Sequence, residues 1–197
     1  MRFLTTLSQL VNQYGDCFVY TDNKVRLLHP QEPPQIADHF IYSPMPEPVM
    51  QHLIQSYCRP FPDDLLELYT FANGLDLFRT LRSITEEISL PVSRLSIYGV
   101  PIFIDRKHLE PFNICLEDLS RLPGTPSNWL KFGCFRDIQH GKQINEYDLY
   151  VDTDAYKAYQ VEREGAALSV VGVWDSIDDC LCNLFEEIQR DKQTLSP

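Results

Sequence analysis

Carboxylate side chains close to residue 150 have the types and the spacing that could bind a cation. Asp152 and Asp154 are separated by one residue, as are the first two ligands of a calcium-binding loop. Such a loop requires glycine at its sixth position and a bidentate glutamate at its twelfth, and these positions are Lys157 and Arg163. The sequence therefore predicts no calcium site, and we expect no other metal site.

Two further pairs of residues have spacings known from enzymes. Glu146 and Asp148 would lie on one side of a strand, where they could act as a glycosidase acid pair only inside a cleft. The sequence supplies no evident wall for such a cleft. His108 and Glu110 match half of the zinc-deaminase pattern, but the Pro-Cys-x-x-Cys half does not follow. We therefore predict a noncatalytic protein without a cofactor.

The cysteines have neither zinc-ligand spacing nor the dense arrangement of a disulfide framework. Cys180 and Cys182 are two apart in an expected helix, where their side chains diverge and Cys180 joins the apolar stripe. Free thiols are typical of the cytoplasm. The N-terminal residues show helical spacing and not the apolar block of a secretory signal, so a cytoplasmic location is predicted.

The charge of the chain is strongly negative and unevenly distributed. Lys and Arg total 17, Asp and Glu total 28, and the net charge is -11. Residues 145–197 hold twelve acidic groups against four basic ones. This excess disfavours binding to nucleic acid or to an anionic membrane, and it favours a basic protein as partner. The oligomeric state stays open.

The alternation of side chains along a strand predicts where these charges lie. If Tyr147, Leu149 and Val151 face the core, the residues that alternate with them along the same strand point outward together. Acidic groups around tyrosine rings suit the docking of a basic protein, whereas the alternative is a solvated face that only keeps the protein soluble. The candidate partner-binding residues, termed the acidic tyrosine face, are Glu146, Asp148, Tyr150, Asp152, Tyr156 and Glu162.

Apolar periodicity and turn residues place the elements of the N-terminal part of the chain. The proline-rich stretch at 29–48 indicates an irregular crossing or a linker. The Asn73-Gly74 pair is expected to cap the helix that precedes it. The expected elements are helix 3–14, strands 17–20 and 24–28, helices 49–57 and 62–72, a strand pair or one strand with a Gly-Pro break within 94–104, and a short helix at 114–122.

From Trp129 onward the pattern becomes strands separated by turn residues, which predicts an antiparallel meander followed by a helix. In that helix Ser176 and Asp179 have the spacing of a capping box, and apolar residues from Ile177 to Ile188 follow helical offsets. The fold class expected is α+β, with a mainly antiparallel twisted sheet packed by helices. The expected organisation is an N-terminal extension at 1–45, a main domain at 46–190 and a tail at 191–197.

Four short landmarks occur in a particular order along this sequence: PFPDDLLELYTFANGLDLF at 60–78, Ile97-Tyr98-Gly99, Trp129, and VVGVWDSIDDCLCNLFEEI at the end. In this order they resemble the SUKH superfamily, which includes the yeast regulator of cell-wall glucan synthesis and many bacterial immunity proteins. The landmark residues, for which we expect structural roles, are Pro62, Asn73, Gly74, Tyr98, Gly99 and Trp129.

The resemblance implies a SUKH-like fold and a binding function. An immunity protein of this type binds a cognate polymorphic toxin, often a nuclease or a deaminase, and neutralises it. The alternative within the superfamily is a regulatory adaptor of the cell-wall-synthesis type. An enzyme whose catalytic groups become neighbours only in the folded chain is a further alternative.

Overall fold

The protein is described from a computed structural model, in which the placed residues are 1–14, 18–21, 24–28, 37–57, 59–83, 89–99, 125–139, 142–164 and 167–194. The predicted short helix at 114–122 and the His108-x-Glu110 motif lie outside these residues. None of the described helices is both long and apolar enough to cross a bilayer.

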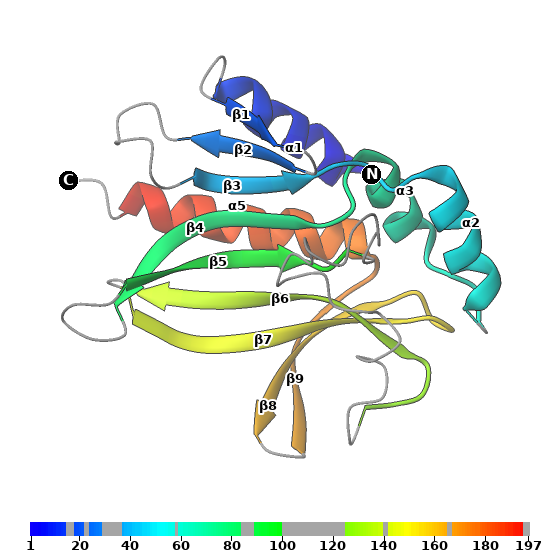
Figure 1. The fold of residues 1–197 in the computed structure, drawn as a ribbon. Helices are drawn as coiled ribbons and strands as arrows, with labels where there is room; N and C mark the ends of the chain where they lie inside the picture. The colour runs from blue at the N-terminus through cyan, green and yellow to red at the C-terminus, as the bar shows by residue number, and fades with distance from the viewer. Residues whose placement is uncertain are drawn as a thin grey trace.

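A nine-stranded sheet forms the centre of the fold, and its strands follow one another in sequence order, each antiparallel to the next. Figure 1 shows the sheet twisting along its length and the hairpin of the last two strands bending away from the rest. The strands are β1 Phe18–Thr21, β2 Lys24–Leu28, β3 Ala37–Tyr42, β4 Leu75–Ser83, β5 Ser89–Ile97, β6 Trp129–Gln139, β7 Lys142–Asp152, β8 Ala158–Glu164 and β9 Ala167–Trp174.

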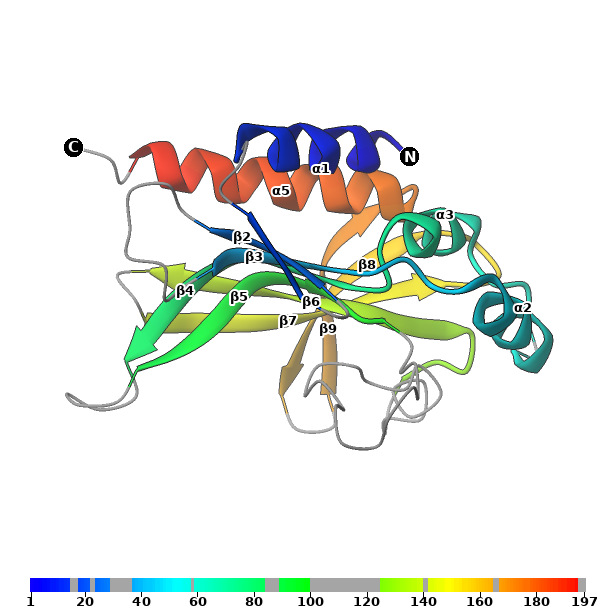
Figure 2. The same ribbon diagram turned by 45° about the horizontal axis from the view of Figure 1, so that its top comes forward.

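Helices cover one face of this sheet, which confirms the predicted α+β class. The described helices are α1 Arg2–Gln13, α2 Glu47–Ser56, α3 Asp63–Phe71 and α5 Ile177–Thr194. Figure 2 shows α1 and α5 side by side across the sheet, with α2 and α3 at one end of it. The opposite face of the sheet carries none of these four helices.

The long helix α5 forms as its sequence predicts. The amide of Asp179 donates to Ser176 Oγ at 3.0 Å, which confirms the predicted cap. The apolar stripe of the helix is buried, with Cys180 and Ile188 fully inaccessible. The helix extends through Thr194, and Asp191 accepts a 2.7 Å ion pair from Arg94 of β5. The prediction of a tail beginning at residue 191 is therefore wrong.

Helix α1 is held against α5 by apolar packing and by charge. The rings of Phe3 and Phe185 meet edge to face with centroids 6.0 Å apart. The amide of Phe3 donates to Asp178 at the start of α5 at 2.8 Å, and the Arg2 guanidinium pairs with both Asp178 and Asp179. Acidic groups stabilise the first turn of a helix. Asp178 therefore stabilises the start of α5, to which it belongs, and also the start of α1, whose amides donate to it.

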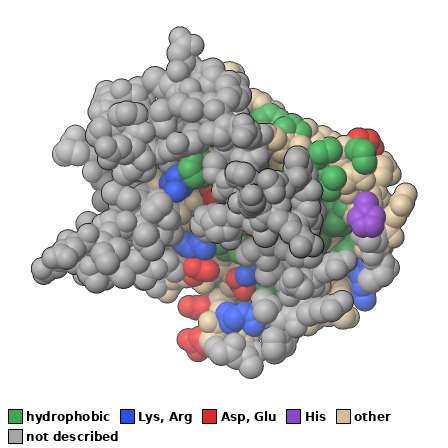
Figure 3. All heavy atoms as spheres, viewed as in Figure 1, with side chains coloured by type: hydrophobic (Ala, Val, Ile, Leu, Met, Phe, Trp, Pro, Cys, Tyr) green, Lys and Arg blue, Asp and Glu red, His purple; other side chains and the backbone are tan. Residues whose placement is uncertain are grey.

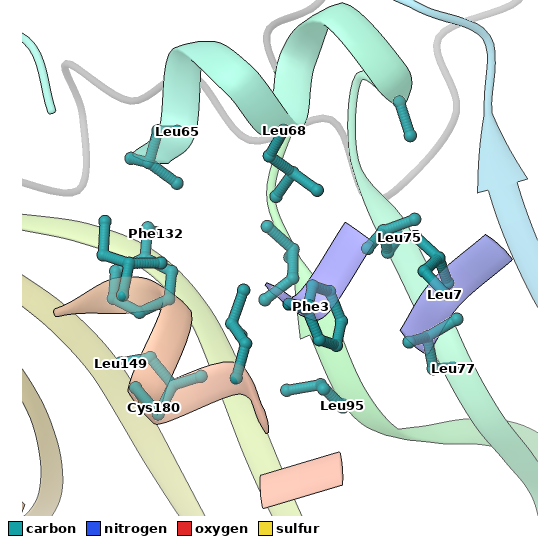
Figure 4. Packing of buried hydrophobic residues seen from close by; sticks show 14 of the residues in the cluster. Phe3, Leu7, Leu65, Leu68, Leu75, Leu77, Leu95, Phe132, Leu149 and Cys180 are labelled. Carbon is teal, nitrogen blue, oxygen red and sulfur yellow. The ribbon is translucent and has the colours of Figure 1, made fainter. Parts of the chain in front are cut away.

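The main core lies between the sheet and the helices. Figure 4 shows side chains from α1, α3, α5 and the central strands converging there, all of them buried. Each fully buried Leu or Phe contributes about 1.5–3 kcal/mol through removal of apolar surface from water. The labelled members are Phe3, Leu7, Leu65, Leu68, Leu75, Leu77, Leu95, Phe132, Leu149 and Cys180.

The structure corrects several boundaries in the N-terminal half. Strand β3 lies within the stretch at 29–48 that we expected to be irregular, and it pairs with both β2 and β4. Strand β4 was not predicted at all. Its Phe78 has φ of 54°, so the consecutive residues Leu77 and Phe78 are both in the main core. This break in alternation removes the periodicity by which a strand is recognised.

Helix α3 ends earlier than predicted and by a different means. Its C-cap residue is Ala72, which is extended with φ of -153°, so the prediction that Asn73-Gly74 caps the helix is wrong. Gly74 has the expected positive φ, at 105°, but it uses this conformation to enter β4. In contrast, the four-strand meander β6–β9 is present as predicted.

Candidate functional site

The sheet face away from the helices carries polar side chains, and we term it the polar face. Leu75 and Leu77 of β4 belong to the main core, so Asp76 between them points to the other side. In β6, Lys131 lies in the same way between the core residues Leu130 and Phe132. Both polar side chains are nevertheless buried.

Asp76 is the centre of one hydrogen-bonded group on the polar face. Its carboxylate accepts from Ser96 Oγ at 2.7 Å and from Tyr42 Oη at 3.1 Å. Burial raises the pKa of this carboxyl, and the hydrogen bonds from Ser96, Ser93 and Tyr42, with the nearby charge of Arg79, act against that rise. Arg136 Nη1 donates to Ser96 Oγ at 3.4 Å and so joins this group to the next strand.

Asp76 should make the stability of the protein depend on pH. Because its folded-state pKa lies above the ordinary value of 3.8, the folded state binds more protons than the unfolded state in the window between the two values. Stability contributed by the neutral carboxyl is therefore lost as pH rises through this window. We expect Asp76→Asn to abolish that loss, measured by urea unfolding of both proteins from about pH 4 to about pH 7. If the free energy of unfolding changed with pH in the same way for the two proteins, this prediction would be wrong.

Asp148 is the centre of a second group on the polar face. Its carboxylate pairs with Lys131 Nζ at 2.6 Å and with Arg163 Nε at 3.4 Å. Tyr150 Oη donates to Asp148 at 3.3 Å and accepts from Arg163 Nη2 at 2.9 Å. The positive groups come from β6 and β8, on either side of β7. This network neutralises the Asp148 carboxylate with groups of the same chain, so its charge is not presented to a partner.

The acidic tyrosine face is therefore not present as predicted. Asp148 and Tyr150 do share one side of β7, but both are buried, with exposed fractions of 8% and 0%. Glu146 pairs with Arg136 at 2.8 Å. Glu162 is opposite Tyr147, which packs against the main core, so it extends on the other side of the sheet. Figure 3 likewise shows acidic and basic side chains next to one another in the lower part of the molecule.

The other two predicted residues of that face belong to the turn after β7. Asp152 accepts hydrogen bonds from the amides of Asp154 and Ala155 at 2.8 Å and 2.9 Å and from Asn128 Nδ2 at 2.8 Å. Partial burial acts to raise the pKa of Asp152, but these hydrogen bonds outweigh it and lower the pKa. Tyr156 is 47% exposed with φ of 56°. Of the six candidates, only Tyr156 presents a largely open side chain that makes no hydrogen bond or ion pair with other placed residues.

The landmark residues behind the SUKH resemblance do come together. A Cβ added to Gly99 would lie 2.1 Å from the carbonyl oxygen of Asn73, and one added to Gly74 would lie 3.1 Å from the amide nitrogen of Gly99. Tyr69 Oη donates to the carbonyl of Tyr98 at 2.9 Å. The two short motifs thus form one close backbone contact between the end of α3 and the end of β5.

The remaining landmarks also have packing roles. Pro62 is the N-cap residue of α3. The indole of Trp129 stacks on the ring of Tyr159 with centroids 4.5 Å apart and lies 5.6 Å from the ring of Tyr150. Burial raises the pKa of the Tyr98 phenol and of the Cys134 thiol, which contact each other on the polar face. A thiol with a raised pKa is a poor nucleophile.

Comparison with family models, with curated proteins and with solved structures found no match for this chain. The SUKH resemblance therefore stays a prediction. In the placed part of the chain, no three His, Cys, Asp or Glu side chains are grouped as metal ligands would be.

An exposed apolar surface, which the sequence analysis missed, lies on β9. Val170, Val171 and Val173 are 47%, 51% and 54% exposed, and we term them the valine stripe. Val173 pairs with Tyr159 of β8, and Tyr159 in turn pairs with Tyr150 of β7. Val173 therefore lies on the same side of the sheet as the polar face. The strand itself was predicted, but its neighbours and its exposure depend on the sheet order. A run of valines in a strand is equally typical of a buried one.

A bulge explains why two consecutive valines are exposed. Gln160 pairs with Gly172 and Val161 pairs with Val170, so Val171 is an extra residue with no partner on β8. On the other side of β9, the ring of Trp174 lies over Gly172 and packs against the main core. One side of β9 is therefore anchored, and its other side carries the valine stripe.

Proposed function

We propose that this chain is a noncatalytic protein-binding domain and that the valine stripe is its contact surface. The observation that carries the proposal is the exposure of about half of each of three neighbouring valines on one strand. Contiguous exposed apolar side chains are typical of interaction sites, because leaving them in water is unfavourable. The half-buried Trp129–Tyr159 stack beside Val173 adds aromatic area of the kind that anchors interfaces.

The noncatalytic part of the proposal is supported by the state of the titratable groups on the polar face. Asp76 and Asp148 are buried, and both make hydrogen bonds or ion pairs with groups of the same chain. A general acid or base must be within reach of a substrate proton. We place the protein in the cytoplasm, and this is supported by the free thiols of Cys134, Cys180 and Cys182.

The net charge of -11 and the resemblance to the SUKH superfamily support a basic partner. For an immunity protein that partner is a cognate toxin. For the alternative role, a regulatory adaptor, it is another cellular protein. The two roles differ in what binding does to the partner. If the bound partner is a nuclease or a deaminase, a stoichiometric amount of this chain abolishes its activity in the immunity role and leaves it unchanged in the adaptor role.

The contact surface can be tested with polar substitutions. We expect Val170→Ser with Val173→Ser to weaken capture of the partner from the native cell by at least tenfold, since two half-exposed apolar side chains leave the interface. Capture would be quantified by mass spectrometry. The matched control is Ile54→Ser, which removes an apolar side chain 37% exposed on α2 and should leave capture unchanged. Equal capture by all three proteins would contradict the proposed surface.

A further inference from the structure

Strand β9 is the last strand of the sheet, and its outer edge pairs with no other described strand. Its pairing partner in the sheet is β8, and no described strand follows it in the order. The backbone amides and carbonyls along such an edge are available to pair with another extended chain. Figure 1 shows the β8–β9 hairpin bending away from the other strands, so this edge is displaced from the body of the sheet.

The edge lacks the side chains that normally prevent pairing. The sequence of β9 is ALSVVGVW, which contains neither a charged residue nor a proline. Lysine, glutamate and proline are the usual means of blocking an exposed edge strand. The bulge at Val171 is the one protective feature among the described residues of this edge, and it divides the edge into two short regular parts, Ala167–Val170 and Gly172–Trp174. A short segment can pair with either part, whereas a long continuous strand cannot pair with both in register.

The two sides of β9 indicate what the added strand carries. On the valine side, its residues would lie beside Val170 if it pairs with the first part, or beside Val173 if it pairs with the second, and either neighbour favours apolar side chains. On the other side, they would lie beside Ser169, whose partner on β8 is Glu162, and near Glu164, the partner of Ala167. Among the placed residues, neither glutamate has an ion-pair partner. Lysine or arginine is therefore favoured at alternate positions.

We propose that β9 binds its partner by strand addition, and that the added segment alternates apolar residues with lysine or arginine. The inference rests on the proposed binding function and specifies its mode. Backbone hydrogen bonds would supply affinity, and the two faces of β9 would supply specificity. A second copy of this chain is disfavoured as occupant, because it would bring two molecules of charge -11 together edge to edge.

The test uses the full chain and the synthetic peptide KVKVKVK. Upon binding, backbone amides within one of the two regular parts of β9 should exchange hydrogen more slowly in an alternating pattern, since every second amide there points outward. A peptide of the same sequence with N-methyl groups on alternate residues along one edge keeps its charges and valines but loses donors. It should bind at least about tenfold more weakly, because several hydrogen bonds are lost. Equal affinity of the two peptides overturns strand addition.

Charge variants test the second part of the proposal. Glu162→Gln with Glu164→Gln should weaken peptide binding several-fold and reduce its dependence on salt. The matched control is Glu186→Gln, an exposed position on α5 whose replacement should change neither quantity. If the valine variants lose the cellular partner while N-methylation has no effect, strand addition is wrong and the proposed function stands. Dimers of the free chain with protected β9 amides would identify a second copy as the occupant and overturn the proposal.

Discussion

Gly99→Ala should destabilise the protein by about 3 kcal/mol or more, a large part of the total of about 5–15 kcal/mol typical of a domain. The new Cβ would lie 2.1 Å from the carbonyl oxygen and 2.7 Å from the carbonyl carbon of Asn73. Both are backbone atoms, so relief requires movement either of the chain between α3 and β4 or of Gly99, whose neighbour Tyr98 donates its amide to the carbonyl of Phe132 at 2.9 Å.

That chain segment is held from its other side. The amide of Asn73 donates to the carbonyl of Ser43 at 3.1 Å, and the carbonyl of Gly74 accepts from the amide of Tyr42 at 3.2 Å. Shifting the segment away from Gly99 would break these backbone hydrogen bonds, and the groups of Tyr42 and Gly74 that would lose their partner belong to buried residues. The steric conflict at Gly99 therefore has no inexpensive solution.

The measurement is the free energy of unfolding from urea titrations of Gly99→Ala and the unmodified protein. Gly172→Ala is the matched control, because its Cβ would meet the end of the Trp174 side chain at 2.6 Å. A half-buried side chain can move aside, so a loss of about 1 kcal/mol or less is expected for this variant. Equal losses for the two variants would show that the contact between Gly99 and Asn73 adapts easily.

Asp148→Asn should have the second large effect, a loss of about 3 kcal/mol or more. Asparagine has nearly the same shape as aspartate, so the change removes a charge without opening a cavity. Lys131 and Arg163 would then face each other without the carboxylate between them, and the Lys131 side chain is only 10% exposed. An uncompensated buried charge is expensive because it has lost its water without gaining a counter-ion.

An exposed ion pair supplies the control for this prediction. Asp154 pairs with Arg59 at 3.1 Å, but its side chain is 63% exposed. Asp154→Asn should therefore cost less than about 1 kcal/mol. A second variant, Lys131→Met combined with Asp148→Leu, removes both buried charges and should be more stable than Asp148→Asn. If Asp148→Asn unfolds at the same urea concentration as Asp154→Asn, the ion pairs around Asp148 do not stabilise the fold.

The elements that sequence patterns predicted are those whose stabilising contacts are local or strictly periodic. Helix α5 has both a capping residue and an apolar stripe, and the structure confirms each of them. The meander β6–β9 was equally evident, because turn residues separate its strands and β7 alternates regularly. Strand β4 was missed, because the positive φ of Phe78 turns two consecutive residues into the core and breaks the alternation.

Alternation along β7 correctly placed Asp148 and Tyr150 on one side of the strand, and this was determined by the sequence alone. That this side is buried, and that Lys131 and Arg163 neutralise it, was decided only by the tertiary structure. The exposure of the valine stripe depends in the same way on the position of β9 at the end of the sheet. Backbone geometry fixes side-chain direction within a strand, whereas the environment on each side depends on strands distant in sequence.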